Sequence, residues 1–237
     1  MTSGTNSARA TWRRLAARLH VNRRTHAEEP PLRAELLSAD QLEQHGKALA
    51  AAHALSPSRV AGRLLTRLVD NEHTLGGLVK GLAGALEENQ RIAPAGVWLL
   101  DNYYLIEEQI GTAKRHLPKG YSSELPRLLS GPSGGLPRVY DIALEAISHG
   151  DGRIDAESLT RFIGAYQTVA VLKLGELWAI PIMLRLALIE NLRRVGVRIA
   201  AGHEEWGVAG SWADQMMEVA EKDPKSLILV TADMARS

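Results

Sequence analysis

The sequence predicts an all-α fold, an irregular bundle of about seven to nine helices. Leu, Ala, Arg and Glu are abundant, and all four have good helix propensity. Strong strand formers are scarce, since the chain has one Phe and only 5% aromatic residues. Apolar residues recur at helical spacing between Ser, Asp, Pro and Gly residues that are typical of helix ends. A chain of 237 residues can bury a substantial core.

Two capping patterns place the first helices. Ser38-Ala-Asp-Gln41 is a capping-box pattern, so a helix should run from it to about Ala54. Ser56-Pro57 supplies a cap and a first-turn proline for a second helix. Gly76-Gly77 lies inside this second segment and predicts a break or bend, because glycine weakens a helix interior.

A connection rich in proline and glycine divides the chain. Before it, Pro94 should open a helix that continues to about His116. The connection, residues 117–140, holds four prolines and four glycines in 24 residues. Such a loop in a compact domain is either functional or packed around the outside. Residues 136–148 should form the next helix.

Further helices are expected in the C-terminal part. Asp155 should cap the first of them. A long helix should run from about Lys173 towards Ala201, with a kink at Pro181. Ser211-Trp-Ala-Asp214 is a capping pattern that should open another helix, and residues 224–237 could form a last one.

The expected organisation is a basic flexible tail over residues 1–34 and a helical accessory domain over residues 35–237. Residues 1–27 hold six arginines and no acidic residue. The remainder carries 22 of the 28 basic residues against all 27 acidic residues, so it is net acidic. Near the end, the apolar run Leu227-Ile-Leu-Val230 is followed by seven residues without a C-cap, which predicts a domain truncated at its C-terminus.

Composition and charge limit the class of protein. The arginine-rich tail could contact an anionic membrane surface, or it is a solvated tail or a mitochondrial-type presequence. We expect no nucleic acid partner. The absence of Cys excludes disulfides and thiolate chemistry and suits the cytoplasm. The longest apolar run, Leu177 to Leu184, is shorter than the about 20 residues that span a bilayer, so we expect a soluble chain.

The stretch WLLDNYYLIEEQI, Trp98 to Ile110, should contain a core-facing stripe. At about 100° per residue, Leu99, Tyr103, Ile106 and Ile110 fall on one side of the helix. This spacing predicts that these four side chains are buried.

The polar residues of the same helix lie away from this stripe. Asp101 and Glu108 share the opposite face, about 10 Å apart along the axis, and Asn102 lies on a flank. A carboxylate pair at that separation could bracket a water molecule, as in inverting glycosidases. The other interpretation is a polar face that meets solvent or an arginine of a neighbouring helix.

The helix around Pro181 contains a polar anomaly. Leu177, Ile180, Leu184 and Leu188 form an apolar stripe, and Asn191 falls inside it. A buried Asn needs hydrogen-bond partners, so we expect Asn191 to be hydrogen-bonded. A structural pair is favoured over a ligand contact.

The neighbouring residues Glu190 and Arg194 are spaced i,i+4 in the same helix. We expect them to form a surface ion pair, which contributes little to stability.

Standard catalytic and cofactor signatures are missing from the sequence. It has no P-loop, no Gly-x-Gly-x-x-Gly, no His-Glu-x-x-His and no Gly-x-Ser-x-Gly. Asp151-Gly-Arg-Ile-Asp155 falls short of a calcium loop. The eight histidines are scattered, and His203 lacks a second histidine at helical spacing. We therefore expect no catalytic residue, metal ligand or cofactor in this chain.

Five stretches, within about residues 35–237, carry a family resemblance. They are Pro94–Gln109, His116–Arg127, Leu136–Tyr140, Gly175–Arg185 and Glu190–Arg194. Together, and in this order, they resemble the N-terminal region of bacterial cyclic β-1,2-glucan synthases.

The resemblance implies a role without chemistry of its own. The family consists of very large inner-membrane proteins with a glucosyltransferase domain that uses UDP-glucose and a glycoside-phosphorylase-like domain. This chain has no Asp-x-Asp nucleotide-sugar motif and no Gln-x-x-Arg-Trp motif. The resemblance therefore implies a non-catalytic cytoplasmic helical region that scaffolds or regulates a synthase at the inner membrane, with the remainder of that membrane glucosyltransferase as its partner.

Two other hypotheses stay open. The chain could be a stand-alone soluble α-helical module that binds a ligand or protein through the loop from Pro118 to Pro137 and its neighbours. It could also be an enzyme with Asp101 and Glu108 as acid and base. The candidate interaction residues are Asp101, Asn102, Glu108, Tyr121, Arg127, Arg138, Tyr140 and Asn191.

Overall fold

The computed structural model describes residues 29–32, 35–57, 63–117, 124–150 and 154–222. These residues form six α-helices and no β-strand, so the all-α prediction is confirmed, with slightly fewer helices in this part of the chain than the expected seven to nine. The helices are α2 (Ala39–Ala52), α3 (Leu64–Glu87), α4 (Pro94–His116), α6 (Arg138–His149), α7 (Ala156–Gln167) and α8 (Leu174–Lys222).

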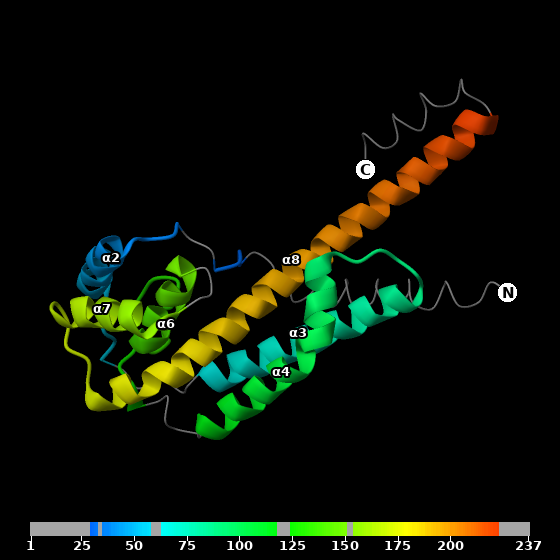
Figure 1. The fold of residues 1–237 in the computed structure, drawn as a ribbon. Coiled ribbons are helices and arrows are strands. Elements are labelled where there is room, and N and C mark those ends of the chain that lie inside the picture. Colours follow the sequence, from blue (N-terminus) through cyan, green and yellow to red (C-terminus); the bar gives the residue numbers. More distant parts are fainter. Residues whose placement is uncertain (1–28, 33–34, 58–62, 118–123, 151–153, 223–237) are drawn as a thin grey trace.

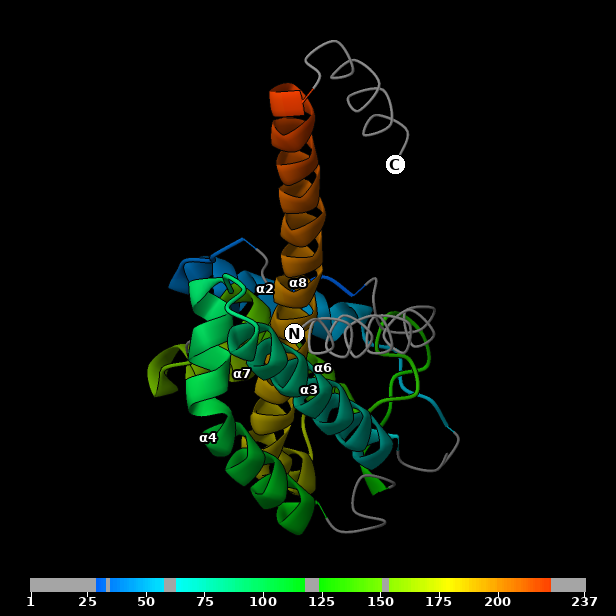
Figure 2. The ribbon, with the colours of Figure 1, turned by 90° about the vertical axis from the view of Figure 1, so that its right-hand side faces the viewer.

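Helix α8 is the long axis on which the other helices are arranged. Figure 1 shows α3 and α4 lying along one side of α8, and α2, α6 and α7 grouped near its N-terminal end. Contacts follow this division, since α3, α4 and α6 each pack on α8, α3 packs on α4, and α2 packs on α7. Figure 2 shows that α8 continues beyond the other helices.

Three predicted helix starts are confirmed. The Ser38 hydroxyl accepts a hydrogen bond from the backbone N–H of Gln41, and the Gln41 side chain accepts one from the Ser38 N–H. This reciprocal pair satisfies two N–H groups that a helix start leaves without a partner. Pro94 occupies the first turn of α4, and Asp155 caps α7 by accepting from the N–H of Ser158.

The expected break at Gly76-Gly77 is wrong, because α3 runs through both residues. Leu75 and Leu78 on either side are fully buried, and their packing outweighs the roughly 1 kcal/mol by which glycine disfavours a helix. A Cβ at Gly76 would lie 3.1 Å from the Tyr103 hydroxyl of α4. Glycine therefore lets α4 approach α3 closely at this point.

The expected helix start at Ser211 is also wrong, since α8 is continuous from Leu174 to Lys222. Adding a residue to a helix that has already formed fixes one residue for one new hydrogen bond, so a capping pattern does not end it. The helix start expected at Ser56-Pro57 is wrong, because neither residue is helical and α3 begins at Leu64. The basic tail and the last helix expected over residues 224–237 lie wholly or almost wholly outside the described residues, and the tail's contact with anionic lipid stays a prediction.

The connection before α6 packs against the domain. This agrees with the prediction of a loop packed around the outside. Leu125, Leu128 and Leu136 are buried, and Gly131 and Gly135 turn the chain with φ of 86° and 81°. Such positive φ angles favour glycine, since a Cβ would be strained there.

The core is formed by the facing stripes of α3, α4, α6 and α8. The predicted stripe of α4 is confirmed, because Leu99, Ile106 and Ile110 are buried and Tyr103 packs partly buried against them. Within the described ranges, every helix is too short or too polar to cross a lipid bilayer.

Candidate functional site

The largest group of buried charges lies between α3, α8 and the segment 29–32. We name it the Glu190 cluster, and its members are Glu29, Arg67, Asn71, Glu190, Arg193 and Arg194. Glu190 is fully buried at its centre. Arg67 donates to both carboxylate oxygens of Glu190, from Nε at 3.0 Å and from Nη2 at 2.7 Å, and Asn71 Nδ2 donates at 2.8 Å.

Helix α8 adds two guanidinium groups to the same carboxylate. Arg193 donates to Glu190 Oε1 at 2.8 Å and Arg194 donates to it at 3.0 Å. Glu29 accepts from Arg67 at 3.1 Å and also from Arg193. The cluster therefore fastens the segment 29–32 to both helices.

The electrostatics of the cluster keep its groups in fixed charge states. Burial opposes the ionised form of Glu190, but the hydrogen bonds and charges of Arg67 and Arg193 hold its pKa well below the usual range. Burial raises the pKa of the neighbouring Tyr140, and the Glu190 carboxylate raises it further. A general acid or base needs a pKa near the working pH, so this cluster is an ion-pair network rather than a proton-transfer site.

The cluster overturns one sequence-based expectation. The pair Glu190–Arg194 was expected on the surface, but Glu190 has no solvent-exposed area. The i,i+4 spacing places the two side chains together correctly, but it carries no information about which face of the helix is buried.

A second buried ion pair involves a predicted interaction residue. Arg138 of α6 donates to the two carboxylate oxygens of Glu176 at 2.6 and 2.8 Å, and to the Val171 carbonyl at 2.8 Å. The hydrogen bond to Glu176 raises the pKa of Arg138 above its usual value, although burial opposes this. The pair ties α6 to the start of α8.

Three of the four residues proposed to form a binding surface around the proline-rich loop are buried. Arg127, Arg138 and Tyr140 are 3%, 5% and 1% exposed, so these three side chains are part of the interior. Arg127 donates to the Gly135 carbonyl at 2.9 Å and so holds the loop together. Tyr121 lies outside the described residues.

A solvent-accessible groove runs between α4 and α8. Its volume is about 560 Å³. It is lined by Trp98, Leu105, Ile106, Gln109, Pro181, Leu184, Arg185, Leu188, Ile189, Asn191 and Leu192. We call it the α4–α8 groove. Eight of these eleven side chains are apolar, so the groove is a candidate site for an apolar partner.

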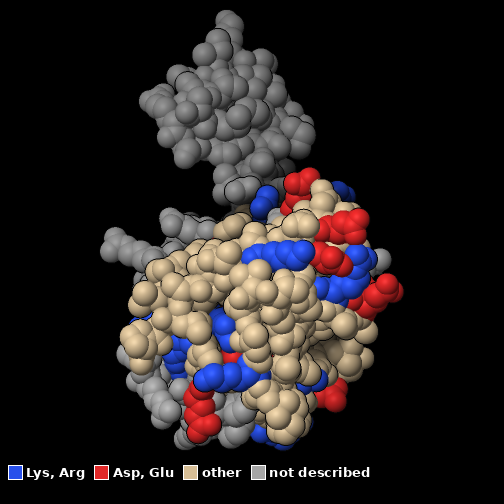
Figure 3. Space-filling view, turned by 90° about the vertical axis from the view of Figure 1, so that its left-hand side faces the viewer, with Lys and Arg blue, Asp and Glu red and all other residues tan. Residues whose placement is uncertain are grey.

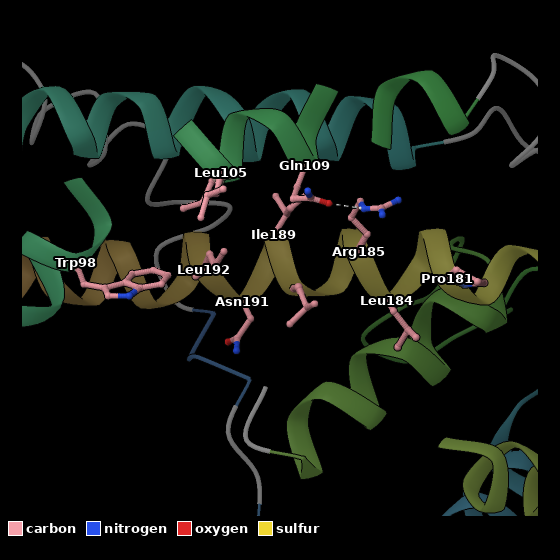
Figure 4. A pocket seen from close by; sticks show the side chains of 11 residues that line it. Trp98, Leu105, Gln109, Pro181, Leu184, Arg185, Ile189, Asn191 and Leu192 are labelled. Atoms are coloured by element: carbon pink, nitrogen blue, oxygen red, sulfur yellow. Dashed lines mark hydrogen bonds between the residues drawn. The ribbon is translucent and has the colours of Figure 1, made fainter. Parts of the chain in front are cut away.

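The polar side chains of the α4–α8 groove are Gln109, Arg185 and Asn191. Figure 4 shows Gln109 and Arg185 pointing towards one another, and Arg185 Nε donates to Gln109 Oε1 at 2.9 Å. Asn191 Oδ1 accepts from the backbone N–H of Leu32 at 2.8 Å, which confirms that Asn191 is hydrogen-bonded. Among the described residues that line the groove there is no Asp, Glu or His, so general acid–base chemistry has no candidate there.

Asp101, Asn102 and Glu108 of α4 do not line the groove. Asp101 and Glu108 are exposed on the face opposite the core stripe, as the helical spacing predicts. Asn102 donates to the Trp98 carbonyl of its own helix at 2.8 Å. Arg185 of α8 bonds to Gln109 of α4 rather than to Asp101 or Glu108.

The apolar surface extends from the groove along α8. Leu174, Trp178, Pro181 and Leu188 are exposed and lie four, three and seven residues apart, so they follow one face of the helix. Figure 3 shows the end of the molecule where α2, α6 and α7 lie, with charged side chains both at one edge and in the lower part of this face. Exposed apolar side chains along one helix face are typical of interaction sites, so this face of α8 is a candidate for one.

Comparison with known proteins connects this domain to one class of enzyme. The cyclic beta-(1,2)-glucan synthase NdvB of Rhizobium meliloti is 31% identical over 204 residues, which are 85% of this chain. The resemblance to cyclic β-1,2-glucan synthases is confirmed. The chain spans only 7% of the length of that synthase. No family model matches this chain.

The α4–α8 groove was missed by sequence reasoning. Leu184 and Leu188 were placed in a buried stripe, whereas Leu188 is 37% exposed and the fully buried face of α8 carries Ala179, Met183 and Glu190. The sequence signal for a second packing surface was the width of the apolar face of this helix. Apolar residues cover more of the circumference of α8 than one packing partner needs.

Proposed function

We propose that this chain is a non-catalytic helical region for cyclic β-1,2-glucan synthesis that binds another part of the synthase through the α4–α8 groove. The proposal rests on one observation, an open apolar groove in a domain related to a short part of a synthase. In this proposal the region lies on the cytoplasmic side of the inner membrane and positions or regulates the glucosyltransferase that uses UDP-glucose.

The occupant we propose is an amphipathic helix of the synthase. Trp98 and Leu105 lie seven residues apart on α4, and Pro181 and Leu188 lie seven apart on α8, so apolar side chains line both walls over about two helical turns. A third helix fits such a trough with apolar residues at i, i+4 and i+7. Arg185 at the groove favours an acidic residue on the flank of that helix.

The experiment measures binding of the purified chain to membranes that contain a cyclic β-1,2-glucan synthase, and to membranes that lack it. We expect binding only to the first, and a loss of at least about ten-fold in the double variant Leu105→Glu/Leu188→Glu, because two charges would be buried in an apolar contact. Asp101→Lys is the control, since it changes an exposed charge on the other side of α4. Equal binding to both membranes, or an unaffected double variant, would refute the proposal.

A second measurement separates this role from catalysis. The chain alone should turn over neither UDP-glucose nor a β-glucan. Turnover that disappears in Asp101→Ala or Glu108→Ala would instead support the enzyme hypothesis.

The size of the groove supports one alternative, a stand-alone module that binds a small apolar ligand. Its volume of about 560 Å³ lies within the range of small-molecule sites, about 300–1,000 Å³. Trp98 lines the groove, so an apolar fluorescent probe should change its emission in wild-type protein and less in Leu105→Glu/Leu188→Glu. Probe binding without synthase binding would favour this alternative.

A further inference from the structure

Three side chains from two helices bring metal-ligating atoms together on α2 and α6, on elements that do not line the α4–α8 groove. His45 lies on α2, and Glu145 and His149 lie one turn apart on α6. Their ligand atoms all lie within 4.8 Å of one another. His45 Nε2 is 2.8 Å and His149 Nε2 is 3.4 Å from the same oxygen, Oε2 of Glu145.

These separations are close to what a tetrahedral metal ion requires. Zinc binds imidazole nitrogen and carboxylate oxygen at about 2.0–2.2 Å, so two ligands of one tetrahedral ion lie about 3.4 Å apart. The His149–Glu145 separation of 3.4 Å already has this value. The His45–Glu145 contact of 2.8 Å would open by roughly half an ångström, a small rotation of a partly exposed carboxylate.

The orientation of His149 points to a cation between these groups. Its Nδ1 lies 2.7 Å from the backbone carbonyl oxygen of Glu35. A carbonyl only accepts, so Nδ1 carries the proton, and in the neutral ring Nε2 then has its lone pair directed at the Glu145 carboxylate. Two acceptors that face each other are compatible only with a proton or a metal ion between them. A carbonyl that accepts from the second ring nitrogen is also the usual support of a metal-binding histidine.

The His45 ring is held in place by its neighbours. It lies parallel to Phe162, with ring centroids 6.1 Å apart and planes 7° apart, and edge-on to His149 at 4.4 Å. A Cβ at the next residue, Gly46, would lie 2.8 Å from the Phe162 carbonyl oxygen, so only glycine allows α2 to approach α7 this closely. The nitrogen that faces Glu145 is therefore positioned by packing before any ion binds.

A nearby histidine shows the contrasting arrangement. His53, the residue directly after α2, has both ring nitrogens engaged, Nδ1 with the Tyr166 hydroxyl at 2.9 Å and Nε2 with Asp141 at 3.0 Å. Its side chain is only 6% exposed. The side chains of His45, Glu145 and His149 are 29%, 33% and 12% exposed, so an ion can enter from solvent.

We propose that His45, Glu145 and His149 bind a divalent ion of the zinc type, with water in the fourth position. Two imidazoles and one carboxylate suit zinc and its neighbours better than magnesium or calcium, which prefer oxygen ligands. The ion fastens α2 to α6, so it stabilises the end of the domain that lies away from the α4–α8 groove.

The test is a titration of the metal-free chain with Zn²⁺ by calorimetry. We expect one ion per chain and a rise of several degrees in thermal midpoint. His45→Gln, His149→Gln and Glu145→Gln should each weaken binding by at least about ten-fold. His116→Gln is the matched control, because His116 is an exposed histidine at the end of α4 and should leave binding unchanged.

The thermal midpoint without metal shows whether each variant is folded, so a folding defect is distinguishable from a lost ligand. Co²⁺ gives an independent reading, since a tetrahedral site produces a visible absorption that the His45→Gln/His149→Gln variant should lack. Wild-type binding no tighter than that of this double variant, or absorption retained in it, would overturn the proposal and leave a hydrogen-bonded His–Glu–His group. Failure here does not touch the proposed role of the groove, which uses other residues.

Discussion

The two sides of α8 differ in which kind of residue they bury. Charged residues are usually exposed and large apolar residues usually buried, and each side of α8 departs from one of these rules. Towards α3, the helix buries the carboxylate of Glu190 completely and leaves Arg193 only 2% exposed. Towards solvent, it leaves Trp178 74% exposed and Leu188 37% exposed. The interior side therefore contains charge, and the exterior side contains apolar surface.

The difference separates what holds the domain together from what it offers to a partner. A buried carboxylate is tolerated only when it is fully paired, and Glu190 accepts from three arginines and Asn71. Exposed apolar area contributes a favourable free energy only when another molecule covers it and removes it from water. The Glu190 cluster thus sets the positions of α3, α8 and the segment 29–32, while the α4–α8 groove stays available for binding.

The largest effect should come from removing the charge on the interior side. Glu190→Ala removes the fully buried one of the two carboxylates that Arg193 and the partly buried Arg67 share, and should lower the free energy of unfolding by about 3–5 kcal/mol. Urea denaturation measures this value. Glu108→Ala, which removes an exposed carboxylate on α4, should change it by less than about 0.5 kcal/mol. Equal effects of the two variants would contradict the assigned roles.

The same carboxylate predicts how stability depends on pH. The pKa of Glu190 is held below its ordinary value of 4.5 in the folded protein, so its contribution is fully present above about pH 4.5 and is lost as the pH falls towards the folded-state pKa. The stability difference between wild type and Glu190→Gln should therefore shrink by about 1.4 kcal/mol per pH unit below that point. Urea denaturation at several pH values measures it, and a difference that stays constant down to pH 3 would show that Glu190 is not ionised in the cluster.

Much of the fold could be predicted from local patterns. The starts of α2, α4 and α7 depend on a capping residue or a proline within one turn, and these are visible in the sequence. The continuity of α3 through Gly76 could not be predicted in this way. It depends on contacts between residues far apart in the chain, in particular the packing of Leu75 and Leu78 near Gly196 of α8.

The sites were less predictable than the fold. Periodicity placed Glu190 on the surface, because it treats every charged residue as solvent-facing and cannot include a partner such as Arg67, which is 123 positions away. The metal-ligand candidates posed the same difficulty, since His45 and Glu145 are 100 residues apart. A family resemblance could be inferred from motif order, but the partner of each buried charge required the packing of the helices.

A glycine tests how tightly the interior side of α8 is packed. A Cβ at Gly196 would lie 2.9 Å from Leu78 Cδ1, and Leu78 is fully buried, so Gly196→Ala should destabilise the protein by about 1–2 kcal/mol. Gly84→Ala in α3 is the control. A Cβ there meets nothing within 4 Å, so this variant should be neutral or stabilising by up to about 1 kcal/mol. The thermal midpoint should be lower for Gly196→Ala than for Gly84→Ala. The reverse order would show that α8 is not closely packed at Gly196.

Asn191 lies at the boundary between the two sides. Its Oδ1 accepts from the Leu32 backbone N–H, so Asn191→Leu removes the acceptor and should reduce stability by about 1 kcal/mol. Asn191→Asp retains an acceptor and should restore most of this loss. A thermal melt that is unchanged in Asn191→Leu would show that the segment 29–32 is held by the Glu190 cluster alone.

The smallest effect on stability should come from the exterior side. Leu188→Lys changes an exposed apolar side chain in the α4–α8 groove to a charged one, and should alter the free energy of unfolding by less than about 0.5 kcal/mol. Binding to synthase-containing membranes should nevertheless fall, because the new charge would have to be desolvated under the bound helix. Urea denaturation and membrane binding on the same preparation compare the two quantities. If Leu188→Lys unfolds the protein as readily as Glu190→Ala does, then Leu188 supports the fold and the groove is not a free surface.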